Sequence, residues 1–205
     1  MIVQVFLISF GISLLGTIPP ATINITVMQL SLKRRAKSAI FLSIGAAILD
    51  TMYAGLAVKI QTFLSEQIEI TNYFYLIAAL VLIVLGIVSL KTKPANVEVE
   101  IKDDQKVGFM KGVILGALNP LAMPFWLGVT TYLQLQGLID LVGINYWSYI
   151  LGVFFGEITL LIIIIKVGSR FQSVATNRTI VNVIPGIAFI LLGVINLGQW
   201  MSFYF

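Results

Sequence analysis

Six long apolar runs, separated by short polar connections, make up most of this chain. They cover residues 2–31, 38–61, 72–90, 108–134, 146–167 and 179–200. A helix needs about 20 apolar residues to cross the hydrocarbon core of a bilayer, and each run is long enough for that. The 205 residues leave no stretch over for a soluble domain. We therefore predict an all-α membrane protein with six transmembrane helices, folded as a single transmembrane domain over residues 1–205.

The composition agrees with a membrane protein and excludes several kinds of chemistry. Hydrophobic residues make up 59% of the chain and charged residues 11%, whereas a soluble domain has about a quarter charged. The net charge of +4 is also typical of nucleic-acid binding, but the basic residues lie between the apolar runs, so we expect no nucleic acid. Cysteine and histidine are both absent, which excludes disulfides, thiolate metal sites and histidine-based catalysis. We expect no cofactor and no metal.

The positions of the basic residues predict how the chain crosses the membrane. Twelve of the thirteen Lys and Arg residues lie in or beside the first, third and fifth connections, and Lys59 is the exception. Because short cytoplasmic loops hold Lys and Arg, these connections are expected inside and both termini outside the plasma (inner) membrane. Tyr146, Trp147 and Tyr149 begin the fifth run, where an interfacial aromatic belt is expected. No basic segment precedes the first run, so we predict a retained helix rather than a cleaved signal peptide.

The two halves of the sequence resemble each other. Leu15–Pro20 matches Leu115–Pro120 at an offset of 100, and Leu85–Leu90 matches Leu192–Leu197 at an offset of 107. The offset of 107 also relates Gly45 to Gly152, Asp50 to Glu157 and Lys59 to Lys166. With three helices in each half, the second half enters the membrane from the opposite side, which makes an inverted repeat of the kind found in many secondary transporters. We predict repeat one at about 1–91, a cytoplasmic linker at about 92–107 and repeat two at about 108–205.

Two acidic residues fall inside the predicted helices. Asp50 lies near the middle of the second run and Glu157 near the middle of the fifth. An acid at mid-bilayer costs about 2.5–3.5 kcal/mol even on a lenient insertion scale, so it is expected to face the bundle interior. One interpretation is a polar contact between helices. The other, which we favour for Asp50 and leave balanced for Glu157, is a group that exchanges a proton as a cationic substrate binds and leaves.

Prolines interrupt the first and fourth runs at matching repeat positions. Pro19 and Pro20 fall in the first run, and Asn119 and Pro120 in the fourth. Proline removes a backbone donor and clashes with the preceding turn, so each helix is expected to kink or break there. Asn is a preferred N-cap and Pro a preferred first helical residue, so Asn119-Pro120 predicts a half-helix whose free N–H groups suit a carboxylate. An ordinary proline kink is the alternative, but two matched breaks favour a substrate site between the repeats.

Further residues accompany these breaks. Thr22, Thr26 and Gln29 share one helix face after the first break, where they line a cavity or bond to a neighbouring helix. Asn24 adds a side-chain oxygen near the same break. Trp126 lies too deep for the interfacial belt, and is either core packing or an aromatic wall of the site. Small-residue helix contacts are predicted at Gly108, Gly112, Gly116, Gly152 and Gly156.

The first half of the chain resembles a known family. Gly16 with the Pro19-Pro20 break, then the basic turn at 33–37, then Gly45-x4-Asp50 resemble the first half of the LysE/RhtB amino-acid exporters. That family usually has Pro-Gly-Pro at its first break, where this chain has Pro-Pro-Ala.

The second half carries the same resemblance, because Lys111-Gly112 leading into Leu118-Asn119-Pro120 is similar to the family's second motif. The likeness covers the whole chain in spacing and hydropathy. It implies export of amino acids or similar small metabolites, driven by the proton gradient.

We therefore predict a secondary transporter, not an enzyme, that exports an amino acid or a similar zwitterion, with proton antiport implied by the resemblance. The solute's ammonium group would meet Asp50 or Glu157, and its carboxylate the half-helix ends after Pro20 and Pro120. The alternative is a divalent-cation exporter of the same superfamily, although such a cation prefers about six oxygen ligands. We expect the solute and the lipid bilayer as partners and leave a homodimer open.

Overall fold

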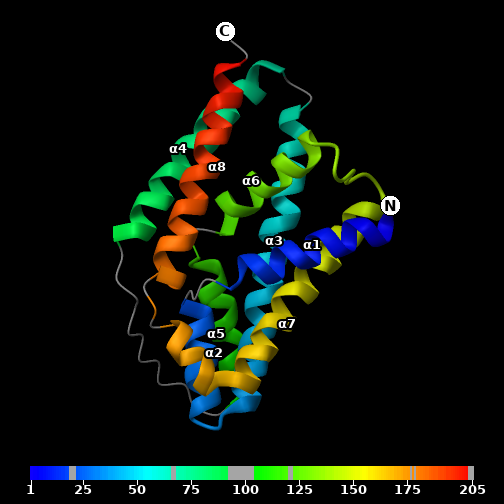
Figure 1. The fold of residues 1–205 in the computed structure, drawn as a ribbon. Helices are drawn as coiled ribbons and strands as arrows, with labels where there is room; N and C mark the ends of the chain where they lie inside the picture. Colours follow the sequence, from blue (N-terminus) through cyan, green and yellow to red (C-terminus); the bar gives the residue numbers. More distant parts are fainter. Residues whose placement is uncertain are drawn as a thin grey trace.

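The structure, a computed structural model, describes residues 1–18, 22–65, 68–91, 104–119, 122–175, 177 and 179–202. Every regular element within these ranges is a helix (Figure 1). The helices are α1 (Ile2–Gly16), α2 (Thr22–Leu32), α3 (Ala36–Ser65), α4 (Ile68–Lys91), α5 (Gln105–Ala117), α6 (Ala122–Leu135), α7 (Ile144–Ala175), the π-helix η1 (Thr179–Val183) and α8 (Ile184–Met201).

The predicted apolar runs correspond to these helices in order. The first run becomes α1 and α2, the fourth becomes α5 and α6, and the sixth becomes η1 and α8, while the other three are single helices. The predicted linker at 92–107 is too long at its end, because α5 already begins at Gln105. Asp104 starts this helix as its N-cap, and its side chain accepts a hydrogen bond from the Val107 N–H at 3.1 Å.

Two helices within the described ranges are long and apolar enough to cross a bilayer on their own. They are the 28-residue stretch Ala36–Phe63 of α3 and the 25-residue stretch Ile144–Gly168 of α7. Helices α5 and α6 pass the same test together, with a bend of 64° between them. Helices α1 and α2 are apolar but too short to span alone. An all-α membrane protein is thus confirmed, whereas the number of six spans stays a prediction.

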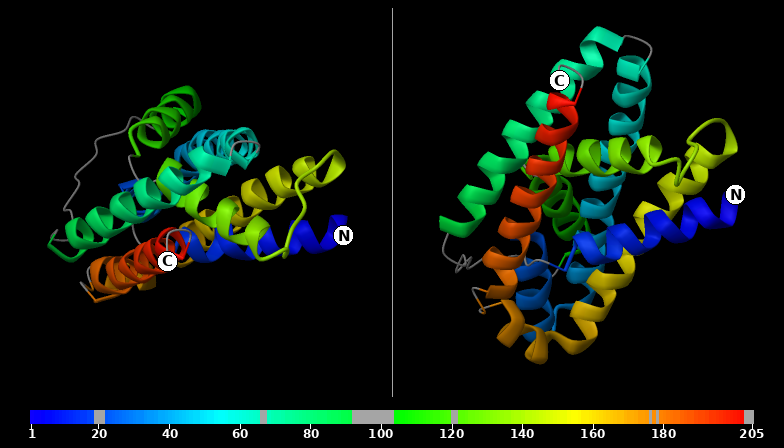
Figure 2. Two further views of the ribbon diagram at one scale, coloured as in Figure 1. Left: turned by 90° about the horizontal axis from the view of Figure 1, so that it is seen from above. Right: turned by 45° about the horizontal axis from the view of Figure 1, so that its top comes forward.

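Three long side-by-side pairings organise the bundle. Helix α1 lies along α7, α5 lies along α3, and α4 lies along α8 (Figures 1 and 2). In addition, α3 packs against α7, α2 against α7, and α6 against α3. Exchanging the two halves of the chain exchanges α1 with α5, α3 with α7, and α4 with α8. These pairings agree with the predicted repeat, which stays a prediction.

Glycines on α5 and α7 allow the close approach of their neighbours. A Cβ added at Gly108 would lie 2.6 Å from the Ser38 carbonyl oxygen of α3, and one at Gly152 would lie 2.6 Å from the Phe6 carbonyl oxygen of α1. Gly112 and Gly156 sit equally close to backbone atoms of the same two neighbours. The predicted small-residue contacts are confirmed, because any side chain at these positions would push the helices apart.

The α4–α8 pair repeats one contact in both directions. Gly86 of α4 lies against Ile190 of α8, and Gly193 of α8 lies against Ile83 of α4. The offset of 107 that relates the two sequence halves converts Gly86 to Gly193 and Ile83 to Ile190. In each direction, an isoleucine of one helix packs against a glycine of the other, as in an isologous contact.

The buried apolar residues form two clusters, one on each side of the molecule's middle. The α2-side cluster consists of Ile23, Val27, Met28, Leu30, Ala39, Leu42, Ala46, Leu160, Leu161 and Ile164. The α6-side cluster consists of Val5, Ala54, Ala57, Val58, Trp126, Leu133, Ile139, Leu141, Tyr149 and Val153. Helices α3 and α7 pass through both clusters, so the middle of each of these helices lies at the junction between them.

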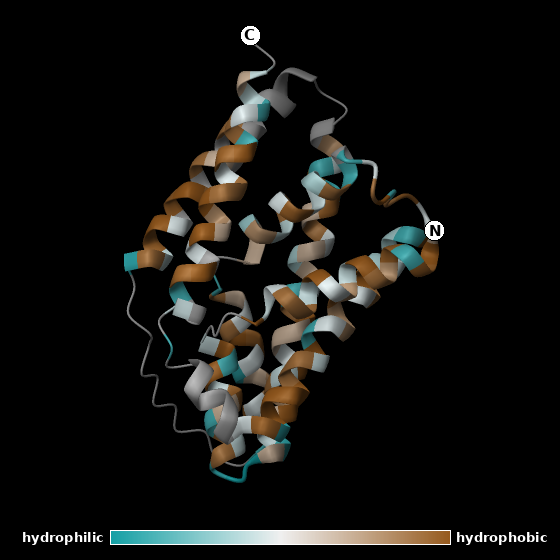
Figure 3. Cartoon of the chain, in the orientation of Figure 1, coloured by the Kyte–Doolittle hydropathy of each residue, from teal (hydrophilic) through white to brown (hydrophobic). Residues whose placement is uncertain are grey.

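The outside of the bundle is apolar along the helices and hydrophilic at their connections. Figure 3 shows hydrophobic residues along α4, α7 and α8 and hydrophilic residues at the turn between α2 and α3. A continuous apolar surface of this kind suits lipid rather than water as its neighbour. Exposed apolar side chains on these three helices include Val84, Ile87, Val88, Ile162, Ile163, Ile187, Leu191, Val194 and Ile195.

Candidate functional site

The fold brings the two intramembrane acids together. Asp50 of α3 follows the last α2-side residue of that helix, Ala46, by one turn. Glu157 of α7 follows the α6-side residue Val153 by one turn, so both acids lie at the junction of the clusters. Their carboxyl groups lie close enough for the charge of one to affect the other, with Asp50 half-buried and Glu157 3% exposed. Sequence spacing alone gave these residues matching positions, and the crossing of α3 and α7 makes them neighbours.

We call Asp50 and Glu157 the acidic centre. Trp126 of α6 lies beside it, so a third helix contributes to the site. The indole is 1% exposed and lies beside the Asp50 carboxyl, but its Nε1–H makes no hydrogen bond of ordinary length and angle. Glu157 Oε2 is likewise buried without a hydrogen-bond partner. The ring packs edge-on against Phe125 and Tyr149, at centroid distances of 5.0 and 6.1 Å. One unpaired donor and one unpaired acceptor therefore flank the pair of acids.

Tyr149 and Thr130 belong to this centre although the sequence analysis missed them. The Tyr149 hydroxyl of α7 and the Thr130 hydroxyl of α6 form a hydrogen bond of 2.9 Å, and neither residue is exposed at all. Tyr149 was expected in an interfacial belt with Trp147, which is 61% exposed. That expectation is wrong for Tyr149 because two residues along a helix turn the side chain by about 200°, to the opposite face. The spacing of Tyr149 from Glu157, eight residues on one helix, was the available signal.

At the first break, Asn24 has a structural contact. Its Nδ2 donates a hydrogen bond of 2.5 Å to the carbonyl oxygen of Thr17, just beyond the end of α1. The terminal carbonyl groups of a helix lack partners within it, so this contact caps α1 from the start of α2. The predicted break residues Pro19 and Pro20 lie outside the described residues.

The polar side chains predicted to share one face of α2 have different surroundings in the structure. Thr22 is exposed, and the buried Thr26 donates its hydroxyl to the Thr22 carbonyl oxygen at 2.7 Å. This hydrogen bond stays inside α2, as threonine often bonds within a helix. The structure gives Thr26 a local role and does not place it beside the acids.

At the second break, α5 ends at Ala117 and α6 begins at Ala122, two residues after Pro120. Pro120 and residue 121 lie outside the described residues. The Ala122 N–H donates to the Asn119 carbonyl oxygen at 3.4 Å, so a turn precedes the helix where an N-cap at Asn119 was predicted. The Ala117 carbonyl oxygen accepts a hydrogen bond of 3.0 Å from Tyr53 of α3. Side chains from outside thus cap both α1 and α5 at matching positions.

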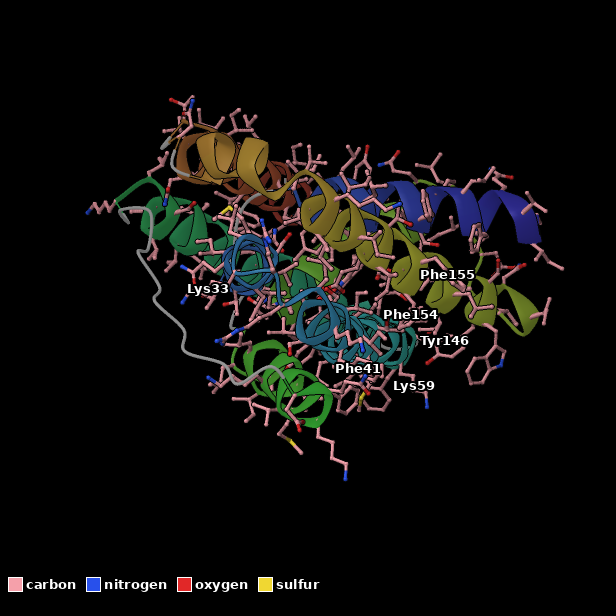
Figure 4. The ribbon with its side chains drawn as sticks, turned by 90° about the horizontal axis from the view of Figure 1, so that it is seen from below. Lys33, Phe41, Lys59, Tyr146, Phe154 and Phe155 are labelled. Carbon is pink, nitrogen blue, oxygen red and sulfur yellow. The ribbon has the colours of Figure 1, made fainter. Side chains whose placement is uncertain are left out.

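Lys59, the basic residue outside the cytoplasmic pattern, lies where α3 ends and α7 begins. Lys59 and Tyr146 approach each other there (Figure 4), and both line a surface pocket of about 480 Å³. The pocket is shared with Val58, Thr62, Phe63, Leu141 and Gly143. Lys59 itself is exposed, so its charge does not enter the acidic centre.

A divalent cation, the alternative substrate, prefers several oxygen ligands close together. No group of three or more His, Cys, Asp or Glu side chains within it lies close enough together to hold a metal ion. Asp50 and Glu157 supply carboxylate oxygens from two residues only, fewer than a hard divalent cation prefers.

Comparison with known proteins gives one match. No curated protein and no solved structure matches the chain significantly. The model of one family, described as LysE type translocator, matches residues 12–198 and so includes both breaks, both acids and Trp126. Members of this family are membrane exporters rather than enzymes. Since the match covers nearly the whole length, the chain belongs to the LysE type translocators.

Proposed function

We propose that this translocator exports an amino acid or a similar small zwitterion by proton antiport, with Asp50 and Glu157 binding the proton and the ammonium group in turn. The observation that carries the proposal is the proximity of two carboxyl groups between two apolar clusters. Intramembrane acids are costly and are retained for ion or substrate pathways. A contact between two acids from opposite repeats suits a site where the repeats meet.

Proton coupling follows from the chemistry of such a pair. Two carboxyl groups in contact away from water cannot both carry a negative charge, so one proton stays between them. An ammonium group brings its own positive charge and its own N–H donors. When it binds, the shared proton is no longer needed and leaves, and when the ammonium group departs, a proton returns. Exchange of one cation for the other is the antiport step.

The solute's carboxylate needs donors close to the acids. The Trp126 Nε1–H is buried and lacks a partner beside Asp50, which suits an anionic oxygen. The N-terminal ends of α2 at Thr22 and α6 at Ala122 follow the two breaks, and the positive end of a helix dipole favours an anionic group. A zwitterion would then lie with its ammonium group at the acids and its carboxylate toward Trp126 and α6.

The finer architecture belongs to the same proposal. Six spans result if α1 with α2, and α5 with α6, each cross the membrane as a broken helix. The exchange of helix partners between the halves and the 107-residue relation within α4–α8 support an inverted repeat with its axis near Asp50 and Glu157. The distribution of Lys and Arg supports both termini outside the plasma membrane, with residues 92–103 inside. The orientation is tested by introducing single cysteines into this cysteine-free chain and labelling them from each side of the membrane. Labelling of Ala95→Cys from outside would contradict the orientation.

The transport assay uses purified protein in vesicles with an imposed proton gradient. Each common amino acid is tested as the internal solute, with manganese and magnesium ions as comparisons. The proposal predicts efflux of at least one amino acid and proton uptake in step with it. It also predicts that the transported amino acid raises the melting temperature, since a ligand that binds only the folded form stabilises it. Metal efflux without amino-acid efflux would favour the divalent-cation alternative.

A further inference from the structure

A row of residues on α6 leads from the acidic centre to one end of the molecule. Trp126, Thr130 and Gln134 are spaced four residues apart and therefore share one side of the helix. Each step rises about 6 Å, so the row covers about 12 Å of the helix axis. Trp126 stands beside Asp50 at one end of the row.

The other end of the row opens into a pocket. Gln134 lines a pocket of about 400 Å³ together with Met1, Gln4, Gly137, Leu138, Ile139 and Asp140. This is the end of the molecule where the N-terminus meets the connection between α6 and α7 (Figure 2). We call it the N-terminal end. The Gln134 Oε1 atom is buried and has no hydrogen-bond partner among the described residues, so the row ends in an acceptor that these residues leave unused.

The middle of the row is closed by Thr130. Its hydrogen bond to Tyr149 joins α6 to α7 between the acidic centre and the pocket. Both side chains are completely buried, and the Trp126 ring packs against the Tyr149 ring from the side of the acids. We call the Thr130–Tyr149 pair the latch. A single hydrogen bond between side chains is weak enough to open and close during transport.

The unpaired acceptors along this route indicate the chemical class that uses it. Glu157 Oε2 lies on the acid side of the latch, and Gln134 Oε1 lies on the pocket side. Asp140 adds an exposed carboxylate at the mouth of the pocket. Acceptor oxygens pair with N–H donors. An ammonium group supplies such donors.

We propose that the solute's ammonium group passes between the acidic centre and the Gln134 pocket along the Trp126–Thr130–Gln134 face of α6, and that the Thr130–Tyr149 latch closes this route. The inference deepens the proposed function by naming the path and its closing residues, and it rests on transport taking place at Asp50 and Glu157. Thr130 and Tyr149 are positioning residues, since they control access without binding the proton.

The test measures access to a cysteine placed between latch and acids. Val153 lies one turn from Tyr149 and one turn from Glu157 on α7 and is fully buried, so Val153→Cys serves as the reporter. Ala54→Cys, one turn from Asp50 on α3, is a second reporter if the first folds poorly. A membrane-impermeant thiol reagent is added to each face of vesicles in turn. Tyr149→Phe and Thr130→Val each remove one hydroxyl and keep the side chain's shape.

We expect each latch variant to speed labelling about three- to tenfold, and only from the N-terminal end, since this is the shift that loss of one hydrogen bond produces. The double variant is expected to match the single ones, because both remove the same bond. Ser43→Ala, which removes a buried hydroxyl in the α2-side half, is the control and is expected to leave labelling unchanged.

Unchanged labelling in both latch variants, or equal acceleration by Ser43→Ala, overturns the proposal. Labelling does not depend on the solute. If the wild-type protein moves no amino acid while the latch variants behave as expected, the proposed function fails and the latch stands.

Discussion

The two halves of the core, on either side of the acids, treat buried polar groups differently. In the α2-side half these groups have protein partners: Asn24 bonds the Thr17 carbonyl, Thr26 the Thr22 carbonyl, and Ser43 the Ala39 carbonyl. In the α6-side half, buried polar atoms of five residues have none among the described residues: Gln61 Oε1, Trp126 Nε1, Thr131 Oγ1, Gln134 Oε1 and Asn145 Oδ1. The hydroxyls of Ser13 and Thr130 do have partners in this half.

This difference distinguishes a half that is held by its own hydrogen bonds from a half that we propose the solute crosses. A buried polar group left without a partner costs about 1–3 kcal/mol, so a protein keeps several of them only where something else supplies the bond. The three α2-side groups have their partners within the protein. In the α6-side half, Trp126 and Gln134 have unpaired atoms on the face of α6 that we propose as the route.

The largest expected effect comes from the junction itself. Asp50→Asn keeps the shape of the side chain and removes its charge and its exchangeable proton. Proton-driven efflux is expected to fall about tenfold or more, because losing a buried charged contact costs about 2–5 kcal/mol. The melting temperature is expected to hold or rise, since a charge within the membrane is itself costly.

Efflux from vesicles and a melting curve on the same preparation check this prediction. Glu157→Gln is the matched variant from the other repeat. Wild-type efflux with Asn at position 50 would falsify the transport role and leave Asp50 as a polar contact between helices.

The next largest effect is expected in the α2-side half. Asn24→Leu removes the donor that caps α1 and leaves the Thr17 carbonyl without that partner. The free energy of unfolding is expected to fall by about 1–3 kcal/mol. Efflux per folded molecule is expected to stay near the wild-type value. Denaturant unfolding in detergent measures the loss, and unchanged stability would show that this half is not held by its polar contacts.

A smaller and opposite change is expected in the α6-side half. Gln61→Leu replaces an amide with an unpaired buried oxygen by an apolar side chain of similar size. Stability is expected to stay level or to rise by about 1 kcal/mol, because no protein hydrogen bond to that oxygen is lost. Efflux is expected to decrease. A loss of stability as large as that of Asn24→Leu contradicts the contrast between the halves.

The smallest effect is expected for Thr26→Val. This change removes a hydroxyl that bonds only within α2, so stability is expected to change by less than about 1 kcal/mol. Efflux is expected to be unchanged. If efflux drops as it does for Asp50→Asn, then the threonine face of α2 lines the route after all, and the α2-side half is not purely structural.

Much of the fold was predictable because a bilayer fixes the length of an apolar run. The helices follow the predicted runs, and the acids were found because a charge inside such a run is rare and costly. The offset of 107 between Asp50 and Glu157 also indicated that they hold equivalent places. Their contact depends on the crossing of α3 and α7, which the sequence alone does not give.

The sequence did not predict which groups the buried polar side chains bond to. Tyr149 stands near the end of an apolar run, as belt aromatics do, and only the packing of α6 shows that its hydroxyl meets Thr130. Asn24 was predicted among the residues that bind the solute, and this stays a prediction. The sequence did not indicate that its amide bonds the Thr17 carbonyl oxygen. Which polar group bonds to which depends on how helices approach in three dimensions.

The glycine faces of α5 and α7 have a mechanical consequence. Where α1 meets Gly152 and Gly156, and where α3 meets Gly108 and Gly112, the backbones approach each other closely. The Ser13 hydroxyl also donates to the Val153 carbonyl oxygen between α1 and α7, so a shift of α1 along α7 has to break this hydrogen bond. The surface between α1 and α7 therefore combines close approach with a bond that fixes the register of the two helices.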